Sequence, residues 1–198
     1  MIKKIFDIIA SVTGLIILSP LLFVIALGIK IDSKGPFLYR GRRVGKGGKP
    51  FYMYKFRTMV VNAEQLGGPT TSEDDTRVTN VGRFLRKHKL DELPQLINVL
   101  KGEMSLVGPR PEVSQVINLL PREKQNIILS VKPGITDFAS LQFSEEGKIV
   151  SRVKDPHEAY LKKIWPAKIR LQLKYVEEQS FFTDIRIILK TIKKILFR

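Results

Sequence analysis

An uncharged stretch from Ile8 to Ile29, near the N-terminus, constrains this chain more than any other feature of the sequence. A straight helix rises about 1.5 Å per residue, so a stretch of this length just crosses a bilayer core of roughly 30 Å. A single membrane-spanning helix is therefore the first interpretation. A cleaved signal peptide fits less well, because the apolar run exceeds the usual length of about 7–15 residues and no clear small-residue cleavage site follows it.

Pro20, preceded by Ser19, lies near the middle of this stretch, where proline removes a backbone hydrogen bond and bends a helix. Both flanks are basic, so the positive-inside rule favours the cytoplasm for both ends, which a broken helix that re-enters the same leaflet satisfies. The backbone groups freed at the break then need partners in the protein or near the headgroups. The flanking cations are Lys3, Lys4, Lys30, Lys34, Arg40, Arg42, Arg43 and Lys46. Because many proline-kinked helices span membranes, the residues alone favour a spanning helix and leave re-entry open.

A second segment, Arg86 to Pro111, carries two adjacent carboxylates, Asp91 and Glu92, which we call the dyad. Pro94 fits only the first turn of a helix, where its missing N–H costs nothing, so a short helix should begin near Asp91. Gly102 is a natural stop for this helix. Four apolar residues at helical spacing predict its buried face: Leu93, Leu96, Ile97 and Leu100.

The dyad has a structural explanation, since Asp is a favoured N-cap and acids suit the positive end of the helix dipole. Its surroundings favour chemistry instead. A stiff Gly-Pro-Arg-Pro turn presents Arg110 after the helix. The cations before the dyad are Arg83, Arg86, Lys87 and Lys89. A carboxylate that attacks phosphorus, another that holds a divalent metal, and cations that take up phosphate charge are the parts of a phosphoryl-transfer site.

Four motifs follow one another along the chain and carry a resemblance to a known family. They are Lys55-Phe56-Arg57-Thr58-Met59, Leu90 to Leu96 (LDELPQL), Met104 to Pro111 (MSLVGPRP) and Lys132 to Thr136 (KPGIT). With them the chain resembles, over nearly its whole length, the bacterial sugar transferases, which are small monotopic phosphoglycosyl transferases acting on polyprenol phosphate. Four motifs in order are far more specific than any one of them.

The resemblance implies transfer of a sugar 1-phosphate from a UDP-sugar to undecaprenyl phosphate, with release of UMP, through a covalent aspartyl-phosphosugar intermediate. It implies the first membrane step of a bacterial surface glycan pathway, at the cytoplasmic face of the inner membrane. Asp91 takes the role of nucleophile and Glu92 that of the metal-associated partner, so both are candidate ligands of Mg²⁺. Family members use a Ser-Pro break for a re-entrant hairpin, so we expect re-entry here, broken at Ser19 and Pro20.

Four basic residues are candidates for binding the substrate phosphates. Lys55 and Arg57 share one face of an expected strand, where cations are usually solvated, and the matching family motif makes them candidates. Arg86 and Arg110 flank the dyad, and family members have arginines at both places. Arginine suits the task because its planar fork grips two phosphate oxygens at once.

The chain has 34 Lys and Arg against 19 Asp and Glu, a formal charge of +15, which predicts a polyanionic partner: nucleic acid, an anionic membrane or phosphorylated substrates. We expect no nucleic acid, because no nucleic-acid motif is recognisable and the cations gather around acids and beside the membrane segment. A membrane-tethered nucleic-acid binder and a non-catalytic scaffold, in which the dyad is only a cap, are the alternatives. With no cysteine, the sequence has no disulfide framework and no thiolate metal site. The oligomeric state stays open, a homo-oligomer included.

The expected fold is α+β and mainly helical. A re-entrant membrane hairpin over residues 1–33 precedes one cytoplasmic, membrane-associated catalytic domain over residues 34–198. This domain should hold a small β-hairpin, with strands at Pro36–Arg40 and Phe51–Met59 around a glycine-rich turn, and a helical catalytic core. Further helices are expected over residues 112–130, broken at Leu119 to Pro121.

The C-terminal part, residues 155–198, is expected to form basic amphipathic helices that lie in the headgroup layer, the alternative being ordinary packing on the domain. The apolar stripe of the last helix consists of Ile185, Ile188, Leu189, Ile192, Ile195 and Leu196. Lys132 to Thr136 should be a turn that leads into an extended segment. Residues 137–141 (DFASL) depart from the commonest family pattern, so we hypothesise that they and the loop at 144–151 contribute to sugar choice.

Overall fold

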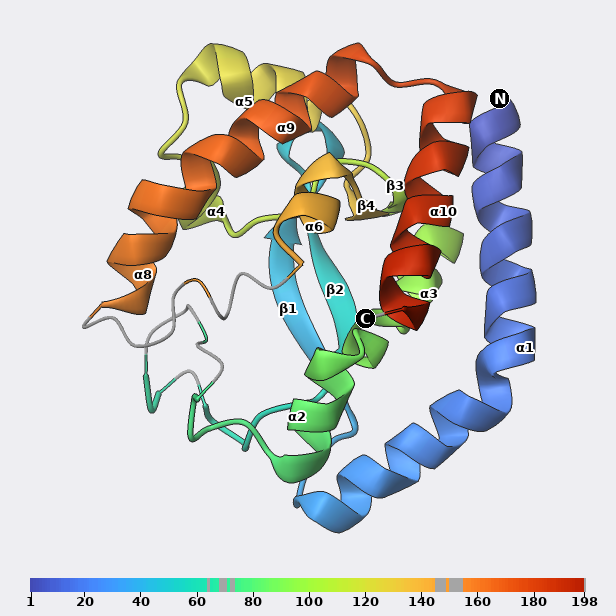
Figure 1. Ribbon diagram of the computed structural model, residues 1–198, viewed down its shortest axis with the longest axis vertical. Coiled ribbons are helices and arrows are strands. Elements are labelled where there is room, and N and C mark those ends of the chain that lie inside the picture. Colours follow the sequence, from blue (N-terminus) through green and yellow to red (C-terminus); the bar gives the residue numbers. More distant parts are fainter. Residues whose placement is uncertain (64, 68–70, 72–73, 145–148, 150–154, 198) are drawn as a thin grey trace.

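The computed structural model describes residues 1–63, 65–67, 71, 74–144, 149 and 155–197. Its first element, α1 (Ile2–Asp32), is one helix of 31 residues with Pro20 inside it. Figure 1 shows α1 bending about half-way along and running down one side of the molecule. Next to the proline, Ser19 Oγ donates a hydrogen bond to the Ile16 carbonyl oxygen at 2.8 Å. The sequence-predicted break is therefore a bend in a continuous helix.

One face of α1 packs on the rest of the protein in both of its halves. Before the bend, Asp7 accepts a hydrogen bond from Ser105 Oγ at 2.7 Å. After the bend, Ile25 and Ile29 are buried in a cluster with Phe56. The opposite face is exposed and apolar: Ile5, Ile9, Val12, Ile16, Ile17, Phe23, Val24, Leu27 and Ile31. Among the described residues, α1 is the one helix long and apolar enough to cross a membrane, yet the domain contacts it along its length.

The predicted β-hairpin is confirmed, although its first strand runs from Leu38 to Val44 instead of covering Pro36–Arg40. Strands β1 (Leu38–Val44) and β2 (Pro50–Phe56) are antiparallel, in a register that pairs Leu38 with Phe56. A 3₁₀ turn at Lys46–Gly48 joins them, and β2 ends at Phe56 rather than at Met59. Phe51 and Met53 are buried, so this face of β2 is the core face. Lys55 follows them in the period-2 pattern and therefore points inward, toward the dyad.

A second, parallel pair of short strands joins two of the family-like motifs. Strand β3 (Ser105–Val107) pairs with β4 (Gly134–Thr136), and just beyond β3 the backbones of Gly108 and Gly134 nearly touch. A Cβ on Gly134 would lie 2.0 Å from the Gly108 nitrogen, so only glycine fits there. The Gly134 N–H donates to the Pro109 carbonyl oxygen at 3.0 Å. This contact fixes the backbone of the Gly-Pro-Arg-Pro turn.

After β4 the chain turns into α6 (Phe138–Gln142). Asp137 is its N-cap and accepts a hydrogen bond from the Ser140 N–H at 2.6 Å. The predicted order is therefore wrong: residues 134–136, expected to be part of the turn, form β4, and residues 137–141, expected to follow as an extended segment, cap and begin a helix. Of the loop at 144–151, to which we assigned a part in sugar choice, all but Ser144 and Ile149 lies outside the described residues.

The dyad lies between two short helices. In α2 (Asn80–Lys87), Thr79 is the N-cap and accepts from the Gly82 N–H at 3.0 Å. A 3₁₀ turn at Leu90–Glu92 then leads to α3 (Gln95–Leu100), whose N-cap is Pro94. The helix expected from Asp91 onward therefore begins only at Gln95.

The predicted buried face of α3 is wrong. Gln95, Asn98 and Val99 are the buried residues of α3, whereas Leu96 is half-buried and Leu100 is 38% exposed. The apolar side turns toward α1, since a Cβ added at Gly14 would lie 3.4 Å from Leu96 Cδ1. Helix α1 presents its own apolar surface outward, so apolar spacing in this protein does not mark the interior.

Of the remaining helices, α4, α5, α8 and α9 lie on the side of the molecule away from α1 (Figure 1). Helices α4 (Ser114–Ile117) and α5 (Arg122–Leu129) confirm the predicted break, with Pro121 as the N-cap of α5. Helix α8 (Pro156–Ala159) and a π-helical turn at Tyr160–Ile164 precede α9 (Trp165–Glu177). Trp165 is buried in a core cluster with Ile128 and Ile169.

The last helix, α10 (Phe181–Leu196), lies beside the N-terminal half of α1. Lys3 of α1 forms an ion pair with the buried Asp184, which also accepts from Tyr175 Oη at 2.7 Å. The face of α10 buried with Tyr175 carries Asp184 and Ile187, so much of the predicted apolar stripe is free of the core. Its exposed members among the described side chains are Leu189, Ile192 and Ile195.

Candidate active site

Glu92 holds the centre of a cluster of charges. Lys55 Nζ, at the end of β2, lies 2.8 Å from Glu92 Oε1. The guanidinium of Arg110 grips both carboxylate oxygens, with Nη2 at 2.5 Å from Oε1 and Nη1 at 3.2 Å from Oε2. Burial raises the pKa of Glu92, but the charges of Arg110 and Lys55 and their hydrogen bonds outweigh it, so the pKa lies well below its ordinary value. Glu92 is therefore an ionised anchor for two cations.

Asp91 has a different environment, although it is the neighbouring residue. Its closest cation is Lys55, with Nζ at 3.9 Å from Oδ2. Its Oδ1 is buried and has no hydrogen-bond partner in the described part of the chain. Burial raises the pKa of Asp91, the charge of Lys55 opposes the rise, and the charge of Glu92 adds to it. One acid of the dyad is thus fixed by salt bridges, while the other keeps a buried carboxylate oxygen without a hydrogen bond in the described part of the chain.

The backbone before the dyad makes a sharp turn. Lys89 has a φ of 57°, in the left-handed region that non-glycine residues rarely adopt. This conformation separates the end of α2 from the 3₁₀ turn at Leu90–Glu92. Left-handed residues outside glycine are costly and recur at functional sites, which agrees with a turn built to present the dyad.

Arg86, on α2, is a third cation near the dyad. Its Nε donates to Thr58 Oγ1 at 2.8 Å. Burial lowers the pKa of Arg86 while the charge of Asp91 raises it, so the guanidinium is close enough to Asp91 to interact with it electrostatically. Thr58, which the sequence did not single out, is the residue that orients Arg86. Its place in the Lys55–Met59 motif was the available signal.

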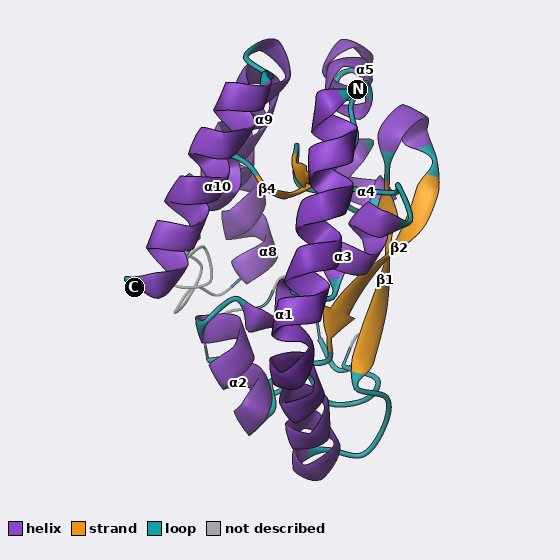
Figure 2. Ribbon diagram, turned by 90° about the vertical axis from the view of Figure 1, so that its right-hand side faces the viewer, coloured by secondary structure: helices purple, strands orange, loops and turns teal. Residues whose placement is uncertain are grey.

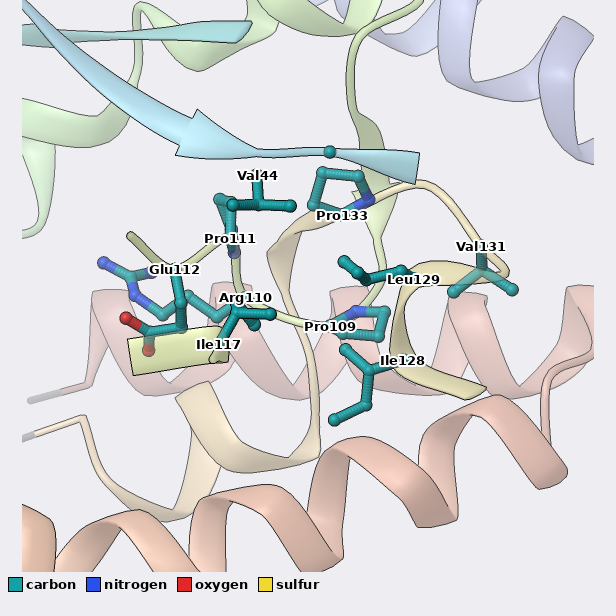
Figure 3. A pocket seen from close by; sticks show the side chains of 11 residues that line it. Val44, Pro109, Arg110, Pro111, Glu112, Ile117, Ile128, Leu129, Val131 and Pro133 are labelled. Atoms are coloured by element: carbon teal, nitrogen blue, oxygen red, sulfur yellow. The ribbon is translucent and has the colours of Figure 1, made fainter. Parts of the chain in front are cut away.

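An apolar hollow lies behind the loop that carries Arg110. Figure 3 shows Pro109, Ile128 and Pro133 around this hollow, with the guanidinium of Arg110 at its edge. On the other side, the Val44 N–H of β1 donates to the Glu112 carbonyl oxygen at 3.0 Å. Prolines on both sides of Arg110 and these backbone contacts stiffen the loop, as its sequence predicted.

Arg57 lies elsewhere. Its Nη1 donates to the Lys34 carbonyl oxygen at 2.6 Å, and its Nη2 donates to the Ser33 carbonyl oxygen at 2.7 Å and to Ser33 Oγ at 2.8 Å. These bonds tie the end of α1 to the residue that follows β2. Lys55, Arg86 and Arg110 therefore lie near the dyad. Arg57 instead binds the C-terminal end of α1.

Two further residues near the dyad were missed. Asn98 accepts from the Tyr54 N–H at 2.9 Å and donates to the Tyr52 carbonyl oxygen at 2.7 Å, which clamps β2 just before Lys55. Gln95 is 1% exposed, and neither atom of its amide has a partner among the described residues. Asp91, Gln95 and Asn98 are spaced at i, i+4 and i+7, so a polar stripe was the signal for this face.

The carboxylate oxygens of the dyad are the kind of ligand that Mg²⁺ prefers. Within the described ranges no group of three or more His, Cys, Asp or Glu side chains could hold a metal. Mg²⁺ in phosphoryl-transfer sites is commonly bound by one or two carboxylates, with substrate phosphates and water completing its shell. Asp91 Oδ2 and Glu92 Oε2, whose described neighbours are Lys55 and Arg110, are the atoms that would hold it.

Comparison with known proteins gives a consistent result. A family model described as bacterial sugar transferase matches residues 1–198. A UDP-N-acetylgalactosamine-undecaprenyl-phosphate N-acetylgalactosaminephosphotransferase of Aeromonas hydrophila is 38% identical over 98% of this chain and 44% of its own length. An undecaprenyl-phosphate glucose phosphotransferase of Komagataeibacter xylinus is 40% identical over 98% of this chain and 36% of its own length. The uncharacterized sugar transferase EpsL of Bacillus subtilis is 38% identical over 98% of this chain and 87% of its own length.

The first two of these relatives are much longer than this chain, which spans less than half of each. Their shared part contains the membrane helix, the hairpin and the dyad segment, because it covers nearly all of this chain. The two relatives act on different sugars by their names, so the likeness extends to a type of protein and not to one sugar.

Proposed function

Because the chain belongs to the bacterial sugar transferase family, we propose that it transfers a sugar 1-phosphate from a UDP-sugar to undecaprenyl phosphate and releases UMP. The different environments of the two carboxylates in the dyad support this reaction. Glu92 is fixed between Lys55 and Arg110, whereas Asp91, beside it, has a carboxylate oxygen without a partner. A nucleophile next to two fixed cations is the arrangement that attack on a phosphate requires.

Asp91 Oδ1 attacks the phosphorus that carries the sugar, and the bond from this phosphorus to the bridging oxygen breaks, so UMP leaves with that oxygen. The product is an acyl phosphate between Asp91 and the sugar phosphate. An oxygen of undecaprenyl phosphate then attacks the same phosphorus, and the bond to Asp91 breaks to return the carboxylate. Lys55, Arg86 and Arg110 hold the phosphate oxygens in both steps. Two steps suit a donor that is dissolved in water and an acceptor that lies in lipid, because the site binds one substrate after the other.

A magnesium ion, when bound at Asp91 and Glu92, would neutralise part of the charge of the diphosphate. The chain's own contribution is to keep Glu92 ionised through Arg110 and Lys55, although the carboxylate is largely buried. Glu92 in this way orients the two cations that meet the substrate.

Release of UMP tests the function directly. The purified chain, supplied with magnesium, undecaprenyl phosphate and each of a panel of UDP-sugars, is expected to release UMP with at least one donor. Turnover with a single donor would also name the sugar. The absence of UMP with every donor would contradict the proposal and favour the scaffold, while salt-sensitive binding of DNA or RNA would favour the nucleic-acid binder.

We further propose that α1 enters and leaves the membrane on the cytoplasmic side. Lys3 and Asp7, before the bend, contact the same domain that buries Ile25 and Ile29 after it. A helix that spanned the bilayer would carry one of these halves away from the domain. The apolar outward face of α1 and the exposed stripe of α10 are then the surface that meets lipid.

The topology can be tested with single cysteines, because the sequence has none of its own. Lys4→Cys and Lys34→Cys place a thiol at an exposed position near each end of α1. Both are expected to react with a membrane-impermeant maleimide in inverted vesicles and neither in intact spheroplasts. Labelling of the two sites from opposite sides would mean that α1 spans the membrane.

A further inference from the structure

A basic pocket lies next to the dyad but apart from the cations that hold Glu92. Its lining, which we call the lysine pocket, comes from the end of α2, the end of α10 and Ser144, two residues beyond α6. Figure 2 shows α2 and α10 on the same side of the molecule. The lining residues are Lys87, His88, Lys89, Ser144, Lys194 and Ile195. The C-terminal end of a helix attracts cations, which accounts for a lysine on α2 and on α10. This preference does not explain why the C-terminal ends of α2 and α10 line the same pocket.

One residue that lines the pocket, Lys89, is close to the dyad along the chain. Lys89 is the N-cap of the 3₁₀ turn Leu90–Glu92, so it is joined to Asp91 through a single residue. From the opposite wall, Lys194 Nζ donates to the Leu141 carbonyl oxygen at 2.6 Å, which holds the ammonium at the pocket. An ammonium has two more protons to donate, and phosphate oxygens are suitable acceptors.

The rim of the pocket is apolar. Ile195 lines the pocket and continues the exposed side of α10 formed by Leu189 and Ile192. Across from α10, the exposed ring of Phe84 packs on His88 with 4.6 Å between ring centroids. A cationic hollow with an apolar approach matches an amphiphile whose charged end is a phosphate. A soluble nucleotide would not need such an approach.

We propose that the lysine pocket binds the phosphate of the polyprenyl acceptor, with the hydrocarbon chain lying along the exposed face of α10. This inference rests on the proposed function and adds the position of its second substrate. From the pocket, an oxygen of the acceptor phosphate attacks the phosphorus held on Asp91. The new bond forms as the bond to Asp91 breaks, and because the acceptor oxygen arrives already ionised, no base is required.

Lys194→Gln tests the pocket, and Lys190→Gln is the matched control, because it removes the same charge from an exposed position of α10 outside the lining. The assay uses undecaprenyl phosphate in phosphatidylcholine vesicles, which carry no net charge that would attract lysines. Lys194→Gln should raise the KM for undecaprenyl phosphate about 10-fold or more, as the loss of a charge-assisted hydrogen bond predicts. The burst of UMP formed without acceptor should keep its wild-type size and rate, and Lys190→Gln should change neither quantity.

Three results would overturn the inference: an unchanged acceptor KM in Lys194→Gln, an equal rise in Lys190→Gln, or a rise in the donor KM, which would assign the pocket to the nucleotide. Retention of undecaprenyl phosphate by the detergent-solubilised chain, followed by native mass spectrometry, provides a readout that needs no turnover. Wild type should retain the lipid and Lys194→Gln should lose it. Retention without any UMP burst in wild type would contradict the proposed reaction while supporting the pocket.

Discussion

Replacing Asp91 by Asn is expected to reduce UMP-forming turnover by a factor on the order of 10⁴ or more, the loss seen when a residue that forms the covalent intermediate is removed. An amide oxygen carries no charge to attack phosphorus and cannot give an acyl phosphate. The shape of the side chain is retained, and Asp91 Oδ1 makes no hydrogen bond in the described part of the chain, so little else changes. Intact-protein mass spectrometry should detect a sugar-phosphate adduct on wild type supplied with donor, and none on the variant.

The stability of Asp91→Asn separates loss of chemistry from loss of fold. Burial raises the folded-state pKa of Asp91, so the ionised carboxylate costs stability at neutral pH and Asn removes this cost. The melting temperature of the variant should equal or exceed that of wild type at neutral pH. The cost vanishes once both folded and unfolded chains hold the proton, so any advantage of the variant should shrink as the pH falls toward the ordinary value of 3.8.

Asp74→Asn is the control for this substitution, because Asp74 is an exposed acid in the loop before α2. It should leave both turnover and melting temperature unchanged. Near-normal turnover of Asp91→Asn, in a chain that melts normally, would show that the reaction does not pass through an aspartyl phosphate.

Local rules predicted those parts of the fold that local interactions determine. The hairpin follows from a glycine-rich turn between alternating strands, and the break at Pro121 follows from proline geometry. The rigid loop that holds Arg110 was likewise predictable, since Pro109 and Pro111 restrict its backbone. These features depend on a few neighbouring residues and are the same in any surroundings.

The faces of α3 and the place of Arg57 could not be predicted in this way. Apolar spacing indicates which side of a helix avoids water, and near a membrane that side can face another membrane-bound helix instead of the core. The interior side of α3 is the polar one because Asn98 must pair with β2. Arg57 alternates in phase with Lys55, but the chain leaves the strand after Phe56, so the period-2 argument no longer applies.

Arg110→Lys keeps the charge at the dyad and removes the fork, and kcat/KM is expected to fall by about 10²- to 10³-fold, as for other donors that stabilise charge in a transition state. Arg110 contacts both oxygens of Glu92, whereas one ammonium can replace only one of these contacts well. The free energy of unfolding should fall by about 1.5–3 kcal/mol for the lost charged hydrogen bond. Steady-state UMP release and chemical unfolding measure the two effects. Arg42→Lys, at an exposed position of β1, is the matched control and should change neither.

A double-mutant cycle tells whether Arg110 acts on the substrate alone or also through Glu92. If the guanidinium is held in place by the carboxylate, Glu92→Gln already releases it, and adding Arg110→Lys should cost far less than it does in wild type. Fully additive losses would mean that Arg110 meets the substrate independently of Glu92, and that the ion pair only stabilises the fold. We expect strong non-additivity, because Glu92 is bound by both Lys55 and Arg110.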